Sequence, residues 1–135
     1  MPIELRALNH IGIRVKDRSR SLDFYRILGF EEVAWHAGPG VSILRNPAGL
    51  EINLIVNAND DNAGRNVLMD IDGTKYAGYT HAAFRVSSAT QTVEDLAKAG
   101  ISISEGPVNL GGTYLAVFIR DPDLNVVELG EVLQR

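Results

Sequence analysis

The sequence predicts an α+β fold built from two copies of one βαβββ unit. Two stretches are alike: LNHIGIRVKDRSRSLDFYRILGF, which starts at Leu8, and YTHAAFRVSSATQTVEDLAKAG, which starts at Tyr79. Each has a histidine near the start of a strand pattern, followed by an Arg-Val pair, a helical pattern and a glycine. Each copy then ends on a proline-containing turn and a strand that carries a glutamate, in NPAGLEINLI and DPDLNVVELG. A repeat of this length determines the architecture of the whole chain.

In the first copy, residues 8–15 alternate with the period of a strand, because Ile11, Ile13 and Val15 fall on one face. A helix is expected next, with apolar residues at three-residue spacing and Gly29 placed at its end. Three further strands are predicted over residues 31–36, 41–46 and 50–56.

In the second copy, residues 80–86 repeat the strand pattern. Ser88 and Gln91 have the spacing of a helix capping box, and Gly100 is placed where that helix should end. The three remaining strands are predicted over residues 101–105, 114–120 and 126–132. Both copies therefore read βαβββ, and a curved, cup-shaped mixed sheet is expected from the pair.

A chain of 135 residues fits one domain with a core of its own. We expect module 1 over about residues 5–56, a linker over 57–79 and module 2 over about 80–133. The linker is rich in Asn, Asp and Gly but also holds an apolar run, VLM, so it either packs on the sheet or forms a lid. We favour the packed linker, because long loops are functional only some of the time.

Composition limits the kinds of partner. The chain has no cysteine, so disulfides and thiolate metal sites are excluded and any metal must use nitrogen and oxygen ligands. A net charge of −4 argues against nucleic acid, and no apolar run is long enough for a membrane span. The first residues also lack the pattern of a secretory signal, so we expect a cytoplasmic protein that binds a small molecule.

Four polar residues occupy equivalent places in the two copies: His10 and Glu51 in the first, His81 and Glu128 in the second. Each lies one residue away from the apolar positions of its strand, so all four should project from the face opposite the helices. Two imidazoles and two carboxylates can hold a divalent cation and leave positions for water or substrate. A single strand histidine or glutamate is more often an ordinary hydrogen-bonding or solvated residue. The repetition of the pair is what favours a metal site.

These motifs resemble the vicinal oxygen chelate superfamily, which includes glyoxalase I, extradiol ring-cleaving dioxygenases, methylmalonyl-CoA epimerase and fosfomycin resistance enzymes. HIGIRVKDRSRSLDFYRILGF is similar to the first strand and helix of the family, and GYTHAAFRV to the opening of its second module. The resemblance covers nearly the whole chain. It implies paired βαβββ modules around a divalent cation (Ni, Zn, Mn, Co or Fe) and a homodimer.

Within this superfamily, a His–Glu–His–Glu set resembles bacterial glyoxalase I, a lactoylglutathione lyase. The resemblance implies a metal-dependent isomerase or lyase that acts on a small carbonyl or thiol-adduct substrate through an enediolate, with Glu128 or Glu51 as the base. Arg14, four residues after His10, matches an arginine that contacts the substrate in that enzyme. Arg85 occupies the same place in the second copy, so both arginines are equally well explained as parts of the framework.

Two other functions stay open. An Fe(II) extradiol dioxygenase would use His10, His81 and Glu128 as its ligands, with Tyr114 as an acid outside them. A metal-free, drug-binding protein of the bleomycin resistance type would bind its ligand in the same cup. Glu51 discriminates among these functions, because the dioxygenases have no ligand at its position.

Overall fold

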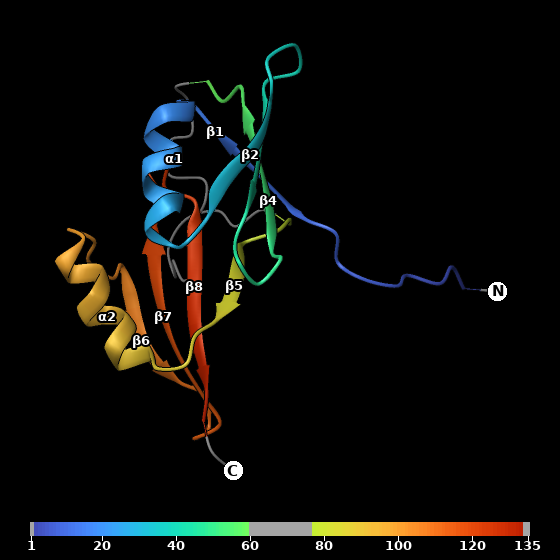
Figure 1. The fold of residues 1–135 in the computed structure, drawn as a ribbon. Coiled ribbons are helices and arrows are strands. Elements are labelled where there is room, and N and C mark those ends of the chain that lie inside the picture. Colours follow the sequence, from blue (N-terminus) through green and yellow to red (C-terminus); the bar gives the residue numbers. More distant parts are fainter. Residues whose placement is uncertain (1, 60–76, 134–135) are drawn as a thin grey trace. The chain divides into compact units, whose positions relative to one another are not determined.

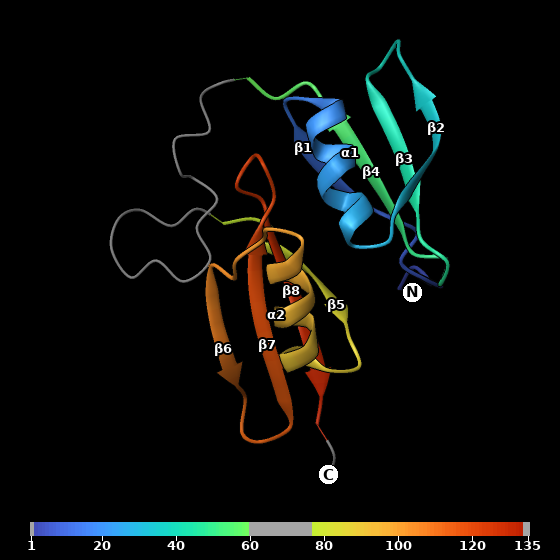
Figure 2. The same ribbon diagram turned by 60° about the vertical axis from the view of Figure 1, so that its left-hand side comes forward.

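The computed structural model describes residues 2–59 and 77–133, drawn as ribbons in Figures 1 and 2. The chain divides into two compact units, Met1–Ala58 and Asn59–Arg135, which we call module 1 and module 2. Each contains one helix and one four-stranded mixed sheet, so the predicted α+β fold with two βαβββ modules is confirmed. Most of the predicted linker, residues 60–76, lies outside the described residues.

Module 1 begins with strand β1 and ends with strand β4, and these two strands pair in parallel at one side of the sheet. The strand order is β1-β4-β3-β2, and the other two pairings are antiparallel. The elements are β1 (Ile11–Val15), α1 (Arg18–Ile27), β2 (Glu31–His36), β3 (Val41–Arg45) and β4 (Glu51–Val56).

Module 2 repeats this topology with the strand order β5-β8-β7-β6, in which β5 and β8 are the parallel pair. Its elements are β5 (His81–Arg85), α2 (Ala89–Lys98), β6 (Glu105–Asn109), β7 (Tyr114–Arg120) and β8 (Val126–Val132). In both modules the first strand therefore lies beside the strand that carries the repeated glutamate, Glu51 in β4 or Glu128 in β8.

The two helices start and stop by the same chemistry. The side chains of Asp17 and Ser88 accept hydrogen bonds from the backbone N–H groups three residues later, as N-cap residues do. Gly29 and Gly100 follow the helices with positive φ angles of 91° and 81°. In each case the next residue donates its N–H to a carbonyl in the last turn, which is the Schellman arrangement. The Gln91 side chain does not complete the predicted capping box, because it donates to Asp95 instead.

The apolar faces of the strands pack under the helices and form the core. In β4, Ile52 and Leu54 are fully buried while Glu51 and Asn53 are partly exposed, as the alternation predicts. Tyr25 of α1 is also fully buried and meets the ring of Phe30 edge-on at 6.5 Å. The predicted assignment of His10, Gly12 and Arg14 to the outer face of the first strand is likewise consistent with their exposure.

One predicted strand is wrong in position. Residues 101–105 were expected to form a strand, but β6 runs over Glu105–Asn109, and only Glu105 is common to both. The pairing of β6 with β7 is irregular between Glu105 and Val108, where Gly106 and Pro107 interrupt the ladder. A proline has no N–H to donate and is tolerated in a sheet at such irregularities, so EGPVN reads as a turn from sequence although it lies in a strand.

None of the helices in the described part of the chain is both long and apolar enough to cross a membrane.

The DPDLN turn before β8 places Leu124 in the left-handed region, with φ of 67°. Asp121 holds this turn, because its Oδ1 accepts the backbone N–H groups of Asp123 and Asn125. The left-handed conformation costs a leucine roughly 1–2 kcal/mol, a cost that glycine does not pay. The Leu124 side chain is 48% exposed, so little burial would be lost with it.

We therefore predict that Leu124→Gly raises the free energy of unfolding by about 0.5–1 kcal/mol, measured by chemical denaturation. This value allows for the greater conformational freedom of glycine in the unfolded chain. Leu50→Gly is the matched control, because Leu50 is similarly exposed (44%) and has no positive φ. That variant should lose stability. An equal loss in both variants would contradict the strain at Leu124.

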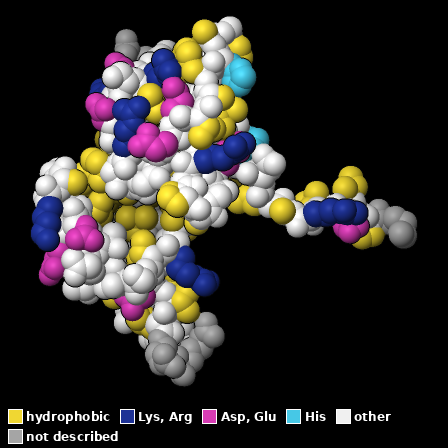
Figure 3. Space-filling model, viewed as in Figure 1, with side chains coloured by type: hydrophobic (Ala, Val, Ile, Leu, Met, Phe, Trp, Pro, Cys, Tyr) yellow, Lys and Arg dark blue, Asp and Glu magenta, His cyan; other side chains and the backbone are white. Residues whose placement is uncertain are grey.

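A bidentate ion pair ties α1 to the sheet of module 1. Arg18 donates from Nε and Nη2 to the Glu32 carboxylate at 2.8 and 2.5 Å, and Ser42 donates to the same carboxylate at 2.5 Å. The Arg18 guanidinium also lies 4.2 Å from the centre of the Trp35 ring. On the face drawn in Figure 3, basic and acidic side chains lie next to one another. The hydrogen bond from Arg18 lowers the pKa of Glu32 against the opposing effect of burial, and Ser42 adds to the lowering.

Because the pKa of Glu32 is lower in the folded state, its contribution to stability is present above the unfolded pKa and is lost as pH falls through the folded one. We predict that Glu32→Gln is less stable than wild type near pH 7 and that this difference shrinks as pH falls from 4.5, the ordinary pKa of a glutamate, through the lower pKa of folded Glu32. Urea denaturation across this range measures it. Glu31→Gln, at an exposed position of the same strand, should show no such convergence, and a pH-independent difference for Glu32→Gln would refute the ionic origin.

Candidate metal centre

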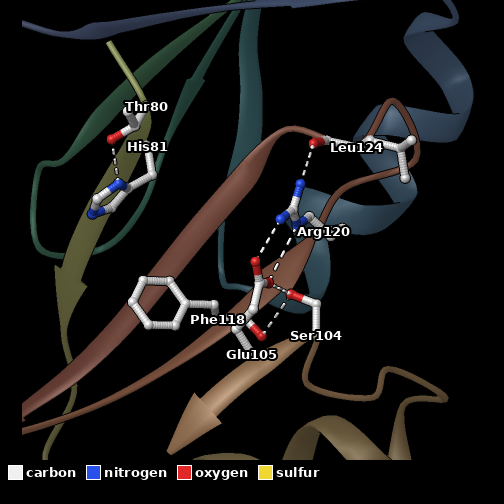
Figure 4. A network of polar contacts seen from close by, with 7 residues as sticks. All are labelled: Thr80, His81, Ser104, Glu105, Phe118, Arg120 and Leu124. Carbon is white, nitrogen blue, oxygen red and sulfur yellow. Dashed lines mark hydrogen bonds and ion pairs between the residues drawn. The ribbon is translucent and has the colours of Figure 1, made fainter. Parts of the chain in front are cut away.

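In module 2 the predicted pair His81 and Glu128 lies in contact. Nε2 of His81 is 2.7 Å from Oε1 of Glu128, and the two side chains are 25% and 11% exposed. The parallel pairing of β5 with β8 sets Ala83 opposite Glu128, so the histidine reaches across from two residues earlier. The Phe118 ring meets the His81 ring edge-on at 5.8 Å, and Figure 4 shows it beside the imidazole.

Tyr114 holds the other oxygen of the same carboxylate. Its hydroxyl donates to Oε2 of Glu128 at 2.6 Å. Burial raises the pKa of Tyr114 to about 12, together with the hydrogen bond to Glu128 and its charge, while Arg85 acts in the opposite direction. The hydroxyl therefore stays protonated and serves as a donor at neutral pH.

In module 1 the pair His10 and Glu51 is joined through Asn53. With its amide oriented for hydrogen bonding, Asn53 donates to Oε2 of Glu51 at 3.2 Å and accepts from Nε2 of His10 at 3.2 Å. The other oxygen of Glu51 accepts from Nε of Arg45 at 2.9 Å, and the Glu51 side chain is 16% exposed. His10 itself directly precedes β1.

The two histidines are oriented in the same way. Nδ1 of His10 lies 2.7 Å from the side-chain oxygen of Asn9, and Nδ1 of His81 lies 2.7 Å from that of Thr80, which Figure 4 shows. In both cases Nε2 is directed toward the polar group on the glutamate strand. Histidines that bind metals usually carry an oxygen partner on the second ring nitrogen, which fixes the ring and its tautomer. Asn9 and Thr80 were not singled out from the sequence, although each is the polar residue just before its histidine in the repeat.

Arg14 donates from Nε to Oδ1 of Asn57 at 2.8 Å, and it lies on the exposed face of β1. Its contact with a substrate stays a prediction. Arg85, at the equivalent place in β5, acts on the Tyr114 pKa through its charge. The two arginines therefore have different surroundings despite their shared place in the repeat.

A second polar network lies on β6 and β7 (Figure 4). Arg120 donates from Nη2 to Oε2 of Glu105 at 2.6 Å, and Ser104 donates to Oε1 of the same carboxylate. Burial by itself would raise the pKa of Glu105, but the hydrogen bonds from Arg120 and Ser104 outweigh it and lower the pKa. This ion pair joins β6 to β7.

The donor atoms suit a divalent cation of the nitrogen- and oxygen-binding type. Each module supplies one imidazole nitrogen and one carboxylate, and each of these groups has a further partner that holds it in place. In the described residues, no three His, Asp or Glu side chains gather into a group that could hold a metal ion. Three or four protein ligands are usual for a zinc ion and its relatives, so one pair alone is an incomplete set.

Comparison with known proteins agrees with this architecture. The family model described as Glyoxalase/Bleomycin resistance protein/Dioxygenase superfamily matches residues 7–129. The fold is similar to that of a glyoxalase/dioxygenase from Nostoc punctiforme, at 24% identity and a TM-score of 0.73 over 99% of this chain and 96% of that one. No curated protein matches the chain in sequence.

Two further structures show the same fold. A glyoxalase family protein from Bacillus cereus is 18% identical, with a TM-score of 0.69 over 98% of this chain and 97% of that one. A genomically encoded fosfomycin resistance protein from Listeria monocytogenes is 20% identical, with a TM-score of 0.68 over 95% and 94%. From the match over residues 7–129 and the two βαβββ modules, this chain belongs to the glyoxalase/bleomycin resistance protein/dioxygenase superfamily.

Proposed function

We propose that this protein is a divalent-metal-dependent enzyme of the glyoxalase I type, an isomerase or lyase that acts on a small carbonyl or thiol-adduct substrate in the cytoplasm. The proposed ligands are His10, Glu51, His81 and Glu128. The strongest support is that both modules carry the same pair, with Nε2 of each histidine directed toward the glutamate strand and Nδ1 occupied by a side-chain oxygen.

Bound to these residues, a divalent cation would polarise substrate oxygens and stabilise the negative charge that develops on them. The chain's own part is to move a proton. Two histidines and one carboxylate are enough to chelate a cation. The second carboxylate is therefore available as the base that removes a proton from the carbon next to the carbonyl. Either Glu51 or Glu128 can take this role, and both are partly shielded from water, which favours proton transfer to and from a bound substrate.

Glu51 favours this proposal over the dioxygenase. A two-histidine, one-carboxylate centre would leave Glu51 without a function at the metal, yet this side chain is mostly buried and is held by both Arg45 and Asn53. We further propose that the active form is a homodimer and that Arg14 contacts the substrate. Both follow from the family rather than from contacts in the modules.

The activity is tested by reconstituting the protein with Ni²⁺, Co²⁺, Zn²⁺ or Mn²⁺ and following the isomerisation of hemithioacetals formed from methylglyoxal and a thiol. We predict metal-dependent turnover, with kcat/KM lowered about 10²- to 10⁴-fold in Glu51→Gln and in Glu128→Gln, the usual contribution of a general base or an essential ligand. Glu94→Gln, at an exposed position of α2, is the control and should match wild type.

Other outcomes point to the alternatives. Wild-type rates in both glutamine variants would contradict the proposal. Fe²⁺-dependent cleavage of a catechol that survives Glu51→Ala would identify a dioxygenase with His10, His81 and Glu128 as its ligands. Tight binding of a drug without metal would identify a sequestering protein.

A further inference from the structure

The strands that carry the two glutamates, β4 and β8, differ at a position on the same face of the sheet as the glutamate. Arg45 pairs with Glu51 in module 1 and Phe118 pairs with Glu128 in module 2, so the two hairpins have the same register. Two residues beyond the glutamate, module 1 has Asn53 and module 2 has Gly130. Asn53 places its amide against Oε2 of Glu51, whereas Gly130 has no side chain to offer.

Tyr114 takes the space that Gly130 leaves. A Cβ atom at position 130 would lie 1.8 Å from the Tyr114 hydroxyl oxygen and 2.1 Å from the ring carbon that bears it. No side chain at position 130 is compatible with this place for the tyrosine, since real contacts of this kind are about 3.4 Å or longer. A side chain at position 130 would therefore displace the Tyr114 hydroxyl from its present place beside Glu128.

Tyr114 comes from a different place in the module than Asn53 does. Tyr114 pairs with Val132 in the same way that Val41 pairs with Ile55, so the module 1 residue equivalent to Tyr114 is Val41. A valine has no polar group to offer a carboxylate. In module 1 the donor to Oε2 of the glutamate is therefore the Asn53 amide, on the same strand as Glu51. In module 2 it is the Tyr114 hydroxyl, on the strand next to that of Glu128.

We propose that Tyr114 is a positioning residue for Glu128: its hydroxyl, admitted by Gly130, holds Oε2 so that Glu128 offers Oε1, beside Nε2 of His81, to a divalent cation. This inference rests on the proposed function, because it concerns the same carboxylate. Groups that hydrogen-bond to metal ligands typically change metal affinity 10- to 100-fold when they are removed. The Tyr114 hydroxyl should have an effect of this size.

The test uses Co²⁺ binding to the full chain, followed by calorimetry and by the visible absorption of the bound ion, which reports on its coordination. We expect Tyr114→Phe to raise the dissociation constant about 10-fold or more and to change the absorption spectrum, because the freed Oε2 alters how Glu128 binds. Tyr79→Phe is the matched control. Tyr79 is fully exposed, and its variant should bind as wild type does.

A double variant tests whether the donor arrangement of module 1 can replace that of module 2. Tyr114→Val with Gly130→Asn installs in module 2 the two residues that module 1 has at these positions, Val41 and Asn53. We expect it to bind Co²⁺ more tightly than Tyr114→Val alone, because the new amide can hold Oε2 as Asn53 does for Glu51. If Tyr114→Val weakened binding only through a loss of fold or packing, an asparagine at position 130 would not restore the binding.

The outcomes separate the two proposals. Wild-type affinity and spectrum in Tyr114→Phe, while the wild-type protein binds Co²⁺, would overturn the role of Tyr114 and leave the proposed function standing. No improvement of the double variant over Tyr114→Val would likewise count against it. A wild-type protein that binds no Co²⁺ would overturn both.

Discussion

The parallel pairing of the first and last strands of each module is the constraint on which the candidate site depends. It brings His81 to Glu128 in module 2, and in module 1 it sets β1, which follows His10, beside β4 with Glu51 and Asn53. Parallel neighbours cannot be joined by a tight turn, so the helix and two intervening strands serve as the crossover. The caps at Asp17 and Ser88 and the Schellman turns at Gly29 and Gly100 set the bounds of the helix within each crossover.

Much of this could be predicted from the sequence, because the signals are local or periodic. The alternation in β1 and β4 assigns their faces, Ser88 and Gly100 mark the ends of α2, and the repeat of His and Glu marks the candidate ligands. The strand β6 could not be placed, because its backbone pairing with β7 overrides the turn-like residues Gly106 and Pro107. The hydrogen bond from Tyr114 to Glu128 could not be predicted either, since it joins residues of two strands and depends on the missing side chain at Gly130.

The two His–Glu pairs have the same residue types in different surroundings. Glu51 lies opposite a cation, Arg45, whereas Glu128 lies opposite the aromatic ring of Phe118. Phe118 belongs to a buried apolar cluster with Ala116 and Val126, against which Tyr114 packs. The donor that holds Oε2 of each glutamate also differs: an amide on the same strand for Glu51 and a hydroxyl on the neighbouring strand for Glu128.

The most direct test of the central claim, that the two His–Glu pairs jointly hold one cation, is the metal stoichiometry measured by native mass spectrometry. The wild-type protein should carry one divalent cation per chain, and either His10→Ala or His81→Ala should remove it, while His36→Ala, at the exposed third histidine, should not. Two cations per chain, with one retained in each histidine variant, would show that each module binds its own metal and would contradict the claim.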